Sequence, residues 1–377
     1  MSSDNYRQYR DFFKNNWLGV CPVVAIFLLT GMGLLALSSA SFPMSDKLLA
    51  KQFIWLCGSM FSSIIFAFIP LELLGKFRHI IICAMAIGLV LVLIPHIGRV
   101  VNGSRRWLKL GSIGFQVSEF AKIAIIVWLS YYISKHIHLI DNVLYGFFYP
   151  MLVLCAFALL ILLEPDYGTA FLFVAVGITL LFLSGTKFSY LLYTAIFGGM
   201  VFSLLIWLNP VRLKRVTSFL DIEGNKSDGS YQLWQGILSF ASGGMFGKGL
   251  GLGRQKISYL PEAHTDFILA VIGEEMGFIF TGFIVLLFFV FTFICLLILR
   301  QQSSIYHRLL GYGATLMIAY QAIMNMCVVS GCMPTKGISL PFISYGGSNL
   351  LLLYSLLGII FNCMRHGQPT LEDVSGQ

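Results

Sequence analysis

The sequence predicts an all-α polytopic membrane protein with about ten transmembrane helices. Of its 377 residues, 57% are hydrophobic and only 11% are charged, whereas about a quarter of an ordinary soluble domain is charged. Apolar stretches long enough to cross a bilayer, about 20 residues each, recur along the chain. They lie at residues 18–39, 51–70, 77–95, 115–134, 146–163, 168–184, 189–208, 266–299, 309–330 and 341–363.

These stretches predict one membrane domain, residues 18–364, between a cytoplasmic N-terminal tail at 1–17 and a cytoplasmic C-terminal tail at 365–377. The first apolar run is too long for a cleavable signal peptide and lacks a small-residue cleavage site after it, so we expect an uncleaved anchor. Residues 209–265 separate the seventh and eighth spans and are predicted to form a large extracytoplasmic loop.

The orientation rests on the charges. An even number of spans places both termini on one side, and a tail that holds Arg7, Arg10 and Lys14 is expected in the cytoplasm. The opposite side carries at least as many Lys and Arg residues, concentrated at 99–109, in the long loop and at Lys336. A cationic outer face suits a polyanionic substrate such as a lipid diphosphate, and solvated surface cations are the alternative.

The boundary between the fifth and sixth spans is the stretch Leu163-Glu164-Pro165-Asp166-Tyr167. Two charges and a proline interrupt one long apolar run there. Proline lacks the amide that a helix interior needs, and charge at membrane depth is costly. The stretch therefore predicts a tight turn between two spans.

Ionisable groups in the fourth span are functional candidates, because charge at membrane depth is rarely kept without a role. In "FQVSEFAKIAIIVW", Glu119 and Lys122 stand three residues apart and share one helical face. Two interpretations stay open. The pair neutralises itself, or Lys122 faces a cavity and its charge acts on Asp266.

The eighth span begins within "PEAHTDFILAVIGEEMG", residues 261–277. Thr265 or Asp266 could cap this helix by accepting a bond from a free amide. A glycoside-hydrolysing carboxyl pair needs a separation of about 5 to 9.5 Å, whereas Asp266 and Glu274 are about 12 Å apart along a helix. We therefore predict that Asp266 acts alone as a general base, with or without a metal, and that Glu274 or Glu275 forms a pair within the bundle.

Two glycine-rich segments remain. "GGMFGKGLGLG" at 243–253 fails the nucleotide-binding motif, because Gly249 follows Lys248 where Ser or Thr is required and Ser242 replaces the first glycine. A flexible outer loop is the prediction.

"MPTKGISLPFISYGGSNLLLLYS" at 333–355 favours irregular backbone, which membrane proteins tolerate where it lines a cavity or is covered by protein. It is a candidate wall of a site.

The chain is similar to a known family. "PEAHTDFILAVIGEEMG", "PTKGISLPFISYGGSNLL", "NGSRRWLKLGSIGFQVSEFAK" and "EPDYGTAFLF" resemble motifs of the SEDS family of bacterial cell-wall proteins, named for shape, elongation, division and sporulation. The likeness runs from about residue 95 to 363. "PEAHTDFI" and "PTKG" favour the member that acts in division over the member that acts in elongation. Asn349 departs from the family, which usually has a serine there.

The resemblance implies a ten-helix peptidoglycan glycosyltransferase that polymerises lipid II into glycan strands during septal wall synthesis. The family's essential aspartate falls on Asp266. Residues expected to bind substrate, the lipid II and the growing glycan chain, are Arg106, Trp107, Glu119, Lys122, His264, Lys336, Ser344 and Tyr345.

The resemblance also implies surroundings and partners. It places the protein in the bacterial cytoplasmic membrane at the division septum, with a class B penicillin-binding protein as transpeptidase partner and other membrane proteins of the division machinery. A divalent cation, Mg²⁺ or Mn²⁺, is expected, although no ligand set is visible in the sequence. No nucleic acid is expected as a partner.

Three other functions stay open. A polymerase of the elongation type would serve cell shape instead of division. A flippase would move lipid II across the membrane without chemistry, because buried charges and broken helices serve transport equally well. A catalytically idle scaffold would recruit division partners and would tolerate loss of Asp266.

Overall fold

The computed structural model describes residues 17–41, 47–101, 104–110, 113–226, 230–258, 260 and 262–365. The tails predicted at 1–17 and 365–377 lie outside these residues, except for Trp17 and Arg365. All ten predicted spans are helices. They are α2 (Val20–Ser41), α3 (Lys47–Phe68), α5 (Arg78–Leu93), α6 (Val117–Lys135), α7 (Tyr149–Leu163), α8 (Tyr167–Leu183), α9 (Phe188–Trp207), α13 (Ile268–Leu299), α14 (Ile305–Val329) and α15 (Gly347–Arg365).

Eight helices within the described residues are long and apolar enough to cross a membrane, and α5 and α8 are shorter apolar helices. Shorter elements lie at their ends and between them. They are η1 (Trp17–Gly19), α4 (Leu71–Lys76), η2 (Ile137–Leu139), the π-helical η3 (Val143–Phe148), α10 (Pro210–Leu220), α11 (Tyr231–Gly243) and α12 (Gln255–Ser258).

The expectation of an all-α chain is wrong at one place. Between α5 and α6 the chain forms an antiparallel sheet of β1 (Gly98–Val101), β2 (Ser104–Leu110) and β3 (Ile113–Gln116), in the order β1-β2-β3. Trp107 pairs with Arg99 on one side and with Gln116 on the other. The hydropathy of so short a polar segment does not reveal strands of four to seven residues.

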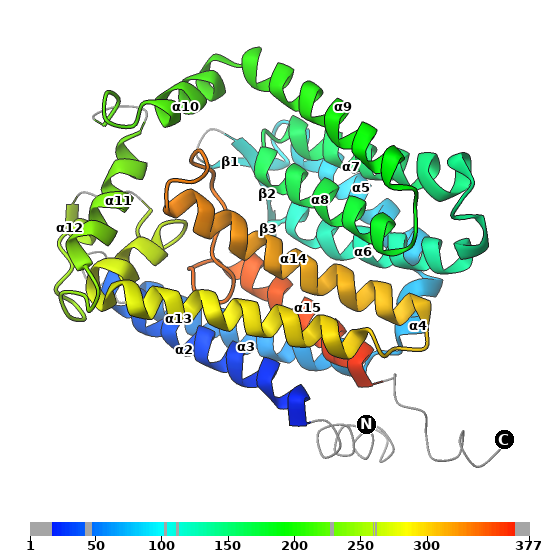
Figure 1. Cartoon of the computed structure of the whole chain (residues 1–377), viewed down its shortest axis with the longest axis horizontal. Helices are drawn as coiled ribbons and strands as arrows, with labels where there is room; N and C mark the ends of the chain where they lie inside the picture. The colour runs from blue at the N-terminus through cyan, green and yellow to red at the C-terminus, as the bar shows by residue number, and fades with distance from the viewer. Residues whose placement is uncertain are drawn as a thin grey trace.

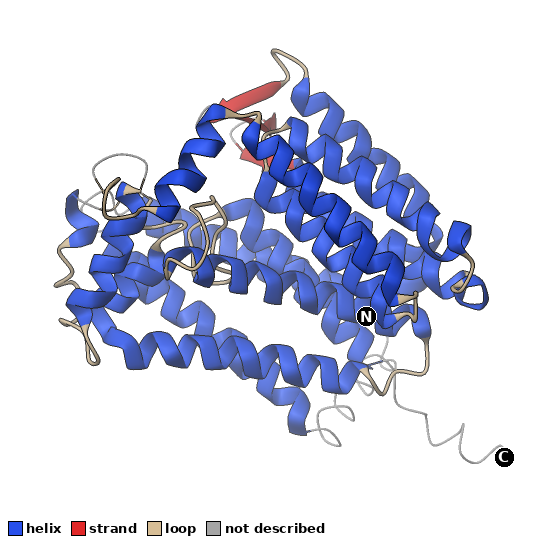
Figure 2. Ribbon diagram, turned by 45° about the horizontal axis from the view of Figure 1, so that its top comes forward, coloured by secondary structure: helices blue, strands red, loops and turns tan. Residues whose placement is uncertain are grey.

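The helices form one bundle whose central members are the most buried (Figure 1). α6, α14 and α15 have over two thirds of their apolar windows inside the protein, whereas only Leu191 of α9 is buried. α9 lies at the edge of the bundle in Figure 1. The sheet and α10 to α12 gather at one end, away from the first residue of α2 and the last residue of α15 (Figures 1 and 2).

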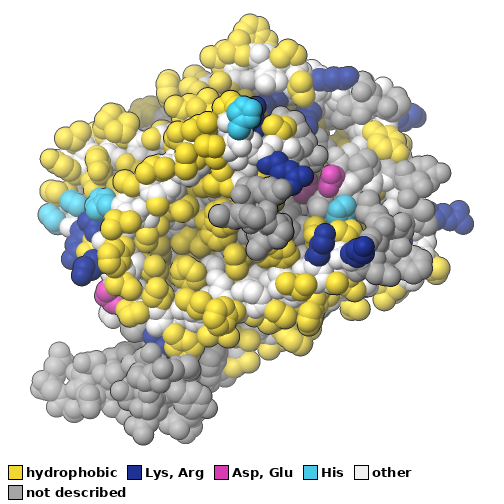
Figure 3. Space-filling model, turned by 180° about the vertical axis from the view of Figure 1, so that it is seen from behind, with side chains coloured by type: hydrophobic (Ala, Val, Ile, Leu, Met, Phe, Trp, Pro, Cys, Tyr) yellow, Lys and Arg dark blue, Asp and Glu magenta, His cyan; other side chains and the backbone are white. Residues whose placement is uncertain are grey.

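The surface agrees with a membrane protein. Figure 3 shows a face that is hydrophobic through its middle, with Lys and Arg side chains gathered toward the two ends. Large apolar side chains stay exposed along most spans, including Phe27, Ile54, Phe197 and Phe289. Such a belt is stable in lipid and unfavourable in water.

α13 contains a kink at Gly277. Its φ of 82° lies outside the helical region and interrupts the helix between residues 268–276 and 278–299. A residue with a side chain is strained at that φ, so glycine is required. The second part has a length of about 33 Å at 1.5 Å per residue, which matches a hydrocarbon core of about 30 Å.

Candidate functional site

The centre of the site is the turn Glu164-Pro165-Asp166 between α7 and α8. The tight turn predicted there is confirmed. Asp166 caps α8, because its carboxylate accepts hydrogen bonds from the backbone amide of Thr169 at 3.1 Å and from its hydroxyl at 3.0 Å. The backbone carbonyls of Glu164 and Pro165 accept hydrogen bonds from basic groups.

Two arginines from different elements meet at this turn. Arg106 of β2 donates from Nε to the Glu164 carbonyl at 3.1 Å and from Nη2 to the Pro165 carbonyl at 2.7 Å. Its Nη1 also lies 3.6 Å from Oδ2 of Asp166. Arg212 of α10 donates to the Pro165 carbonyl at 2.8 Å, and its guanidinium lies 3.4 Å from the ring centre of Tyr167. The small sheet and α10 thus position guanidinium groups over one turn.

Lys336 adds a third cation. It lies in the irregular segment between α14 and α15, with Nζ 5.5 Å from the ring of Phe171 and 5.4 Å from the ring of Phe202. Burial among these groups lowers the pKa of Lys336, whereas the charge of Asp166 raises it and that of Arg212 lowers it. Lys336 therefore shares the electrostatic environment of the turn.

Asp266 stands just before α13, within electrostatic reach of Arg106. The capping alternative is not realised, because α13 begins after Phe267 with no side-chain cap. Thr265 donates instead to the carboxylate of Glu262 at 2.6 Å. Burial, and then the charges of Glu262 and Asp166, raise the pKa of Asp266 while Arg106 lowers it, with the net result that the pKa is about 7. A carboxyl poised near neutral pH suits a general base.

The Asp266 segment is held by the irregular segment that follows α14. Asn325 donates to the carbonyls of Asp266 at 2.8 Å and Ile338 at 2.7 Å, and so ties the two segments together. Ser344 donates to the carbonyl of Thr265 at 2.6 Å. Gly337 lies so close that a Cβ on it would stand 3.2 Å from Oδ2 of Asp266. The expectation that 333–355 forms a site wall agrees with these contacts.

Three more predicted residues surround this core. The amide of Tyr345 donates to the His264 carbonyl at 3.0 Å, and the two rings stand 6.0 Å apart. Trp107 packs over Gly114 of the neighbouring strand, where a Cβ would stand 3.2 Å from its ring. In this structure Ser344 and Tyr345 hold backbone in place, and their binding of substrate stays a prediction.

Glu119 and Lys122 form an internal ion pair in α6. Nζ of Lys122 lies 2.8 Å from Oε1 of Glu119, and the residues are 1% and 7% exposed. Lys122 also reaches Gln321 at 3.5 Å, and Gln321 donates to Asn349 at 3.0 Å. The structure therefore shows the self-neutralising arrangement, and Lys122 does not face an open cavity.

Glu274 and Glu275 are buried within the bundle. Both are paired, as predicted for one of them. Glu274 accepts from Lys248 at 3.0 Å and from the backbone amides of Arg254 and Gln255 at 3.1 Å each. Glu275 accepts from Lys256 at 2.6 Å. The expectation of a flexible loop at 243–253 is wrong, because its backbone is bonded to α13.

Sequence reasoning missed Glu164, Arg212 and Asn325 as site residues. The carboxyl of Glu164 is fully buried, and neither of its oxygens has a hydrogen-bond partner among the described residues. Burial, and then the charge of Asp166, raise its pKa to about 8, while Arg106 lowers it. The interruption of an apolar run by two acids was the available signal, and it indicated only a turn.

The described residues offer few side chains that could bind a metal ion. The described residues contain no group of three or more His, Cys, Asp or Glu side chains that could hold a metal ion. Mg²⁺ is usually bound through one or two carboxylates together with substrate phosphates. Asp166 lies within electrostatic reach of Asp266, and the described residues do not form a complete metal site of their own.

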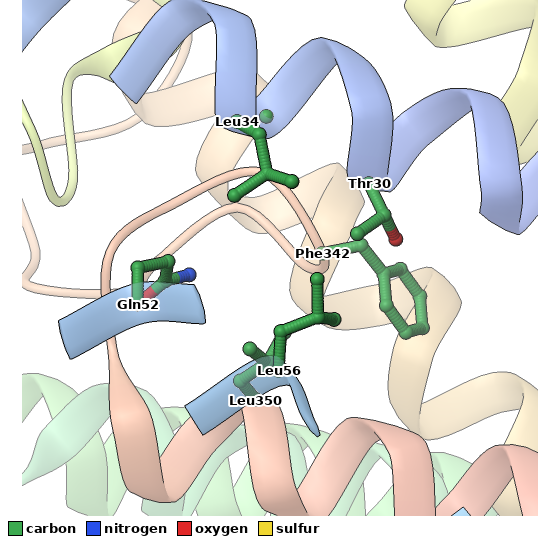
Figure 4. A pocket seen from close by; sticks show the side chains of 7 residues that line it. Thr30, Leu34, Gln52, Leu56, Phe342 and Leu350 are labelled. Atoms are coloured by element: carbon green, nitrogen blue, oxygen red, sulfur yellow. The ribbon is translucent and has the colours of Figure 1, made fainter. Parts of the chain in front are cut away.

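A small recess lies apart from these charges, between α2, α3 and the segment before α15 (Figure 4). Thr30, Leu34, Leu56, Phe342 and Leu350 line it with Gln52, and no charged side chain does. Gln52 donates to the Ser344 carbonyl at 3.3 Å. The recess thus belongs to the packing behind the Ser344 segment.

Comparison with known proteins identifies the family. The model of the FtsW, RodA and SpoVE cell cycle proteins matches residues 20–368. The chain belongs to this family. Proteins named probable peptidoglycan glycosyltransferase FtsW are 37% identical in Coxiella burnetii, with 91% of this chain and 94% of the relative covered, and 38% identical in Legionella pneumophila, with 90% and 87% covered.

Solved structures of this family share the fold. A chain from a peptidoglycan synthase complex that coordinates polymerization and crosslinking superposes with a TM-score of 0.78, at 24% identity over 91% of this chain and 96% of its own. The rod shape determining protein RodA of Thermus thermophilus gives 0.70, at 24% identity over 93% and 97%. The FtsW/RodA fold, with its multiple apolar helices, makes this chain an integral membrane protein.

Proposed function

We propose that this protein polymerises lipid II into glycan strands for the division septum, with Asp266 as its general base. It is a peptidoglycan glycosyltransferase, the activity for which relatives 36 to 38% identical over most of the chain are named. The observation that supports the assignment of Asp266 is its place within electrostatic reach of Arg106, with a pKa raised to about 7.

The chemistry joins two saccharide chains. Asp266 takes the proton from the 4-hydroxyl of the acceptor lipid II as that oxygen attacks the anomeric carbon of the donor chain. A new glycosidic C–O bond forms, the bond to the diphosphate breaks, and the polyprenyl diphosphate leaves with the bonding electrons. A base with a pKa near the working pH is deprotonated often enough to act and basic enough to accept a proton.

The leaving diphosphate needs positive charge. Arg106, Arg212 and Lys336 come from three separate elements and share the surroundings of the Glu164–Asp166 turn. Cations placed where negative charge develops stabilise a transition state more than a ground state. We assign the diphosphate to this cluster, with Arg212 as a member that the sequence did not indicate.

A bound divalent cation would supply further positive charge to the diphosphate. Asp166 is the carboxylate that would hold it, together with phosphate oxygens, which leaves Asp266 free to accept the proton. The transpeptidase partner is a class B penicillin-binding protein, in line with the related complex in which polymerization and crosslinking are coordinated.

The site end of the bundle faces the extracytoplasmic side, and both termini lie in the cytoplasm. Other membrane proteins of the division machinery assemble with the protein.

A role in division is supported by relatives named FtsW. A role in elongation is supported by the fold that the chain shares with RodA. Complementation separates them: cells depleted of the division polymerase should divide when this chain is supplied, and rescue of rod shape alone would assign it to elongation.

A second test separates polymerase from flippase. Purified protein is reconstituted in vesicles with its transpeptidase partner and fluorescent lipid II, and glycan product and lipid translocation are measured on the same sample. We expect glycan strands. Translocation without any glycan product would assign the protein to transport.

A further inference from the structure

The glycine-rich segment 243–253 carries apolar side chains on an unusually well-anchored backbone. The amide of Lys248 donates to the Glu274 carbonyl at 3.0 Å, and that of Gly249 donates to the Glu275 carbonyl at 2.9 Å. In return, the amides of Phe278 and Ile279 donate to the carbonyls of Gly244 at 2.9 Å and Met245 at 3.2 Å. The segment and the kink of α13 therefore satisfy each other's polar backbone groups.

The glycines make this contact possible. Gly243 and Gly247 lie against the backbone of residues 273–276 in α13, and Gly277 lies against the backbone of residues 245–247. A Cβ on any of these three glycines would collide with main-chain atoms. Gly247 has a φ of 78°, which favours glycine. The backbone of the segment is thus held against α13.

Those side chains are large, apolar and exposed. Phe246 is 84% exposed and Met245 is 56% exposed. They adjoin Phe278 and Ile279, the first residues of the α13 span after the kink, which are also exposed. The exposed stripe of that span continues through Phe283, Leu286, Phe289 and Phe293. The tip of the segment thus prolongs a surface that meets lipid.

We propose that Met245 and Phe246 insert into the membrane interface at the end where α13 begins, and so fix the depth of the segment 243–253, whose Lys248 pairs with Glu274 of α13. The occupant of this surface is phospholipid. The tip lies level with the first turn of a 22-residue span and is continuous with its lipid-facing stripe, so lipid is the partner that this surface meets. Aromatic and apolar residues at such a level bury themselves at the headgroup boundary.

The charges near the tip agree with this placement. Arg254, directly after the segment, is exposed, whereas the charge of Lys248 is neutralised by its ion pair with Glu274. Cations that flank an apolar tip attract the anionic headgroups of phosphatidylglycerol. The tip therefore has an apolar part for acyl chains and a basic border for phosphates.

Photocrosslinking tests the proposal. The photoreactive phenylalanine analogue benzoylphenylalanine replaces Phe246 in one sample, Phe278 as lipid-facing control in a second and Glu223, exposed between α10 and α11, as aqueous control in a third. Each full-length protein is reconstituted in vesicles of phosphatidylethanolamine and phosphatidylglycerol, irradiated and analysed by intact mass. A monodisperse gel-filtration peak before reconstitution confirms folding.

The expected result is a phospholipid adduct at position 246 that is comparable in yield with position 278 and several times that at position 223. A yield at 246 no higher than at 223 would overturn the proposal. The same proteins are irradiated in native membranes as a second arm. An adduct at 246 with another protein in place of phospholipid would overturn it too, because the tip would then be a protein contact.

Discussion

Nδ2 of Asn325 lies 2.8 Å from the carbonyl oxygen of Asp266, and the same nitrogen lies 2.7 Å from the carbonyl of Ile338. One amide group in α14 thus joins the segment that carries Asp266 to the segment that carries Lys336. The relative position of Asp266, the proposed base, and of Lys336 depends on this side chain.

Asn325→Leu tests that tie. The apolar side chain has a similar volume but cannot donate, so two buried carbonyls lose a partner, at about 1–3 kcal/mol each. We expect lower thermal stability and a loss of polymerisation of at least about tenfold. Melting temperature and lipid II turnover are measured together. Wild-type turnover in a less stable protein would show that Asn325 does not position Asp266.

The activity should depend on the ionisation of Asp266. Because its pKa is about 7, the base is protonated in acid, and kcat/KM should fall by about tenfold per pH unit well below that value. A pH–rate profile with a saturating concentration of divalent cation checks this. A profile that is flat from about pH 5.5 to 8 would exclude Asp266 as the titrating base.

The raised pKa of Asp266 should also make the folded state less stable as the pH rises. The folded state keeps its proton up to about pH 7, whereas the unfolded chain releases it near 3.8. The stability from this group is complete below the lower pKa and is lost as the pH rises to the higher one. Asp266→Asn should therefore melt above wild type, by more at about pH 8 than at about pH 5. An equal difference at both values would contradict the raised pKa.

Arg106 and Arg105 form a matched pair. Arg106→Gln removes the hydrogen bonds to Glu164 and Pro165 and a charge that lowers the pKa of Asp266. We expect a loss of about a hundredfold in kcat/KM and a shift of the acid limb to higher pH. Arg105→Gln should keep near-normal turnover. Equal losses in both variants would indicate that general positive charge matters and that the specific contacts do not.

The pair of Glu119 and Lys122 can be separated into structural and chemical roles. Lys122→Met leaves a buried carboxylate without its partner, which costs about 3–5 kcal/mol. The double variant Glu119→Gln with Lys122→Met should recover much of the melting temperature. If it stays inactive, the charges act in the reaction. If it polymerises lipid II normally, the pair serves only the bundle.

The fold could be predicted from sequence because ten apolar runs of bilayer length are a local property of the chain. The sequence could separate Asp266 from Glu274 by helix geometry, but it did not show that the charges of Glu262 and Asp166 act on Asp266 in the fold. The β2 strand around Arg106 could not be predicted, since short polar strands leave no periodic signal. Arg212 stands 46 positions after Asp166 in the chain, and only tertiary packing brings its guanidinium to Pro165.

The glycine segment shows a different limit. Its composition suggests mobility, because glycine permits many conformations. In the structure those same glycines allow the backbone to approach α13 so closely that the amides of Lys248 and Gly249 donate to the carbonyls of Glu274 and Glu275. Composition alone does not distinguish a glycine that frees a chain from one that allows a close contact.

The central claim is that Asp266 is the base of a glycosyl transfer. The most direct measurement is gel analysis of glycan strands made from lipid II by wild type and by Asp266→Asn, each purified with the transpeptidase partner, with Glu262→Gln as the control for a neighbouring carboxylate. We predict strands from wild type and Glu262→Gln and none from Asp266→Asn. Strands of wild-type length and yield from Asp266→Asn would contradict the account.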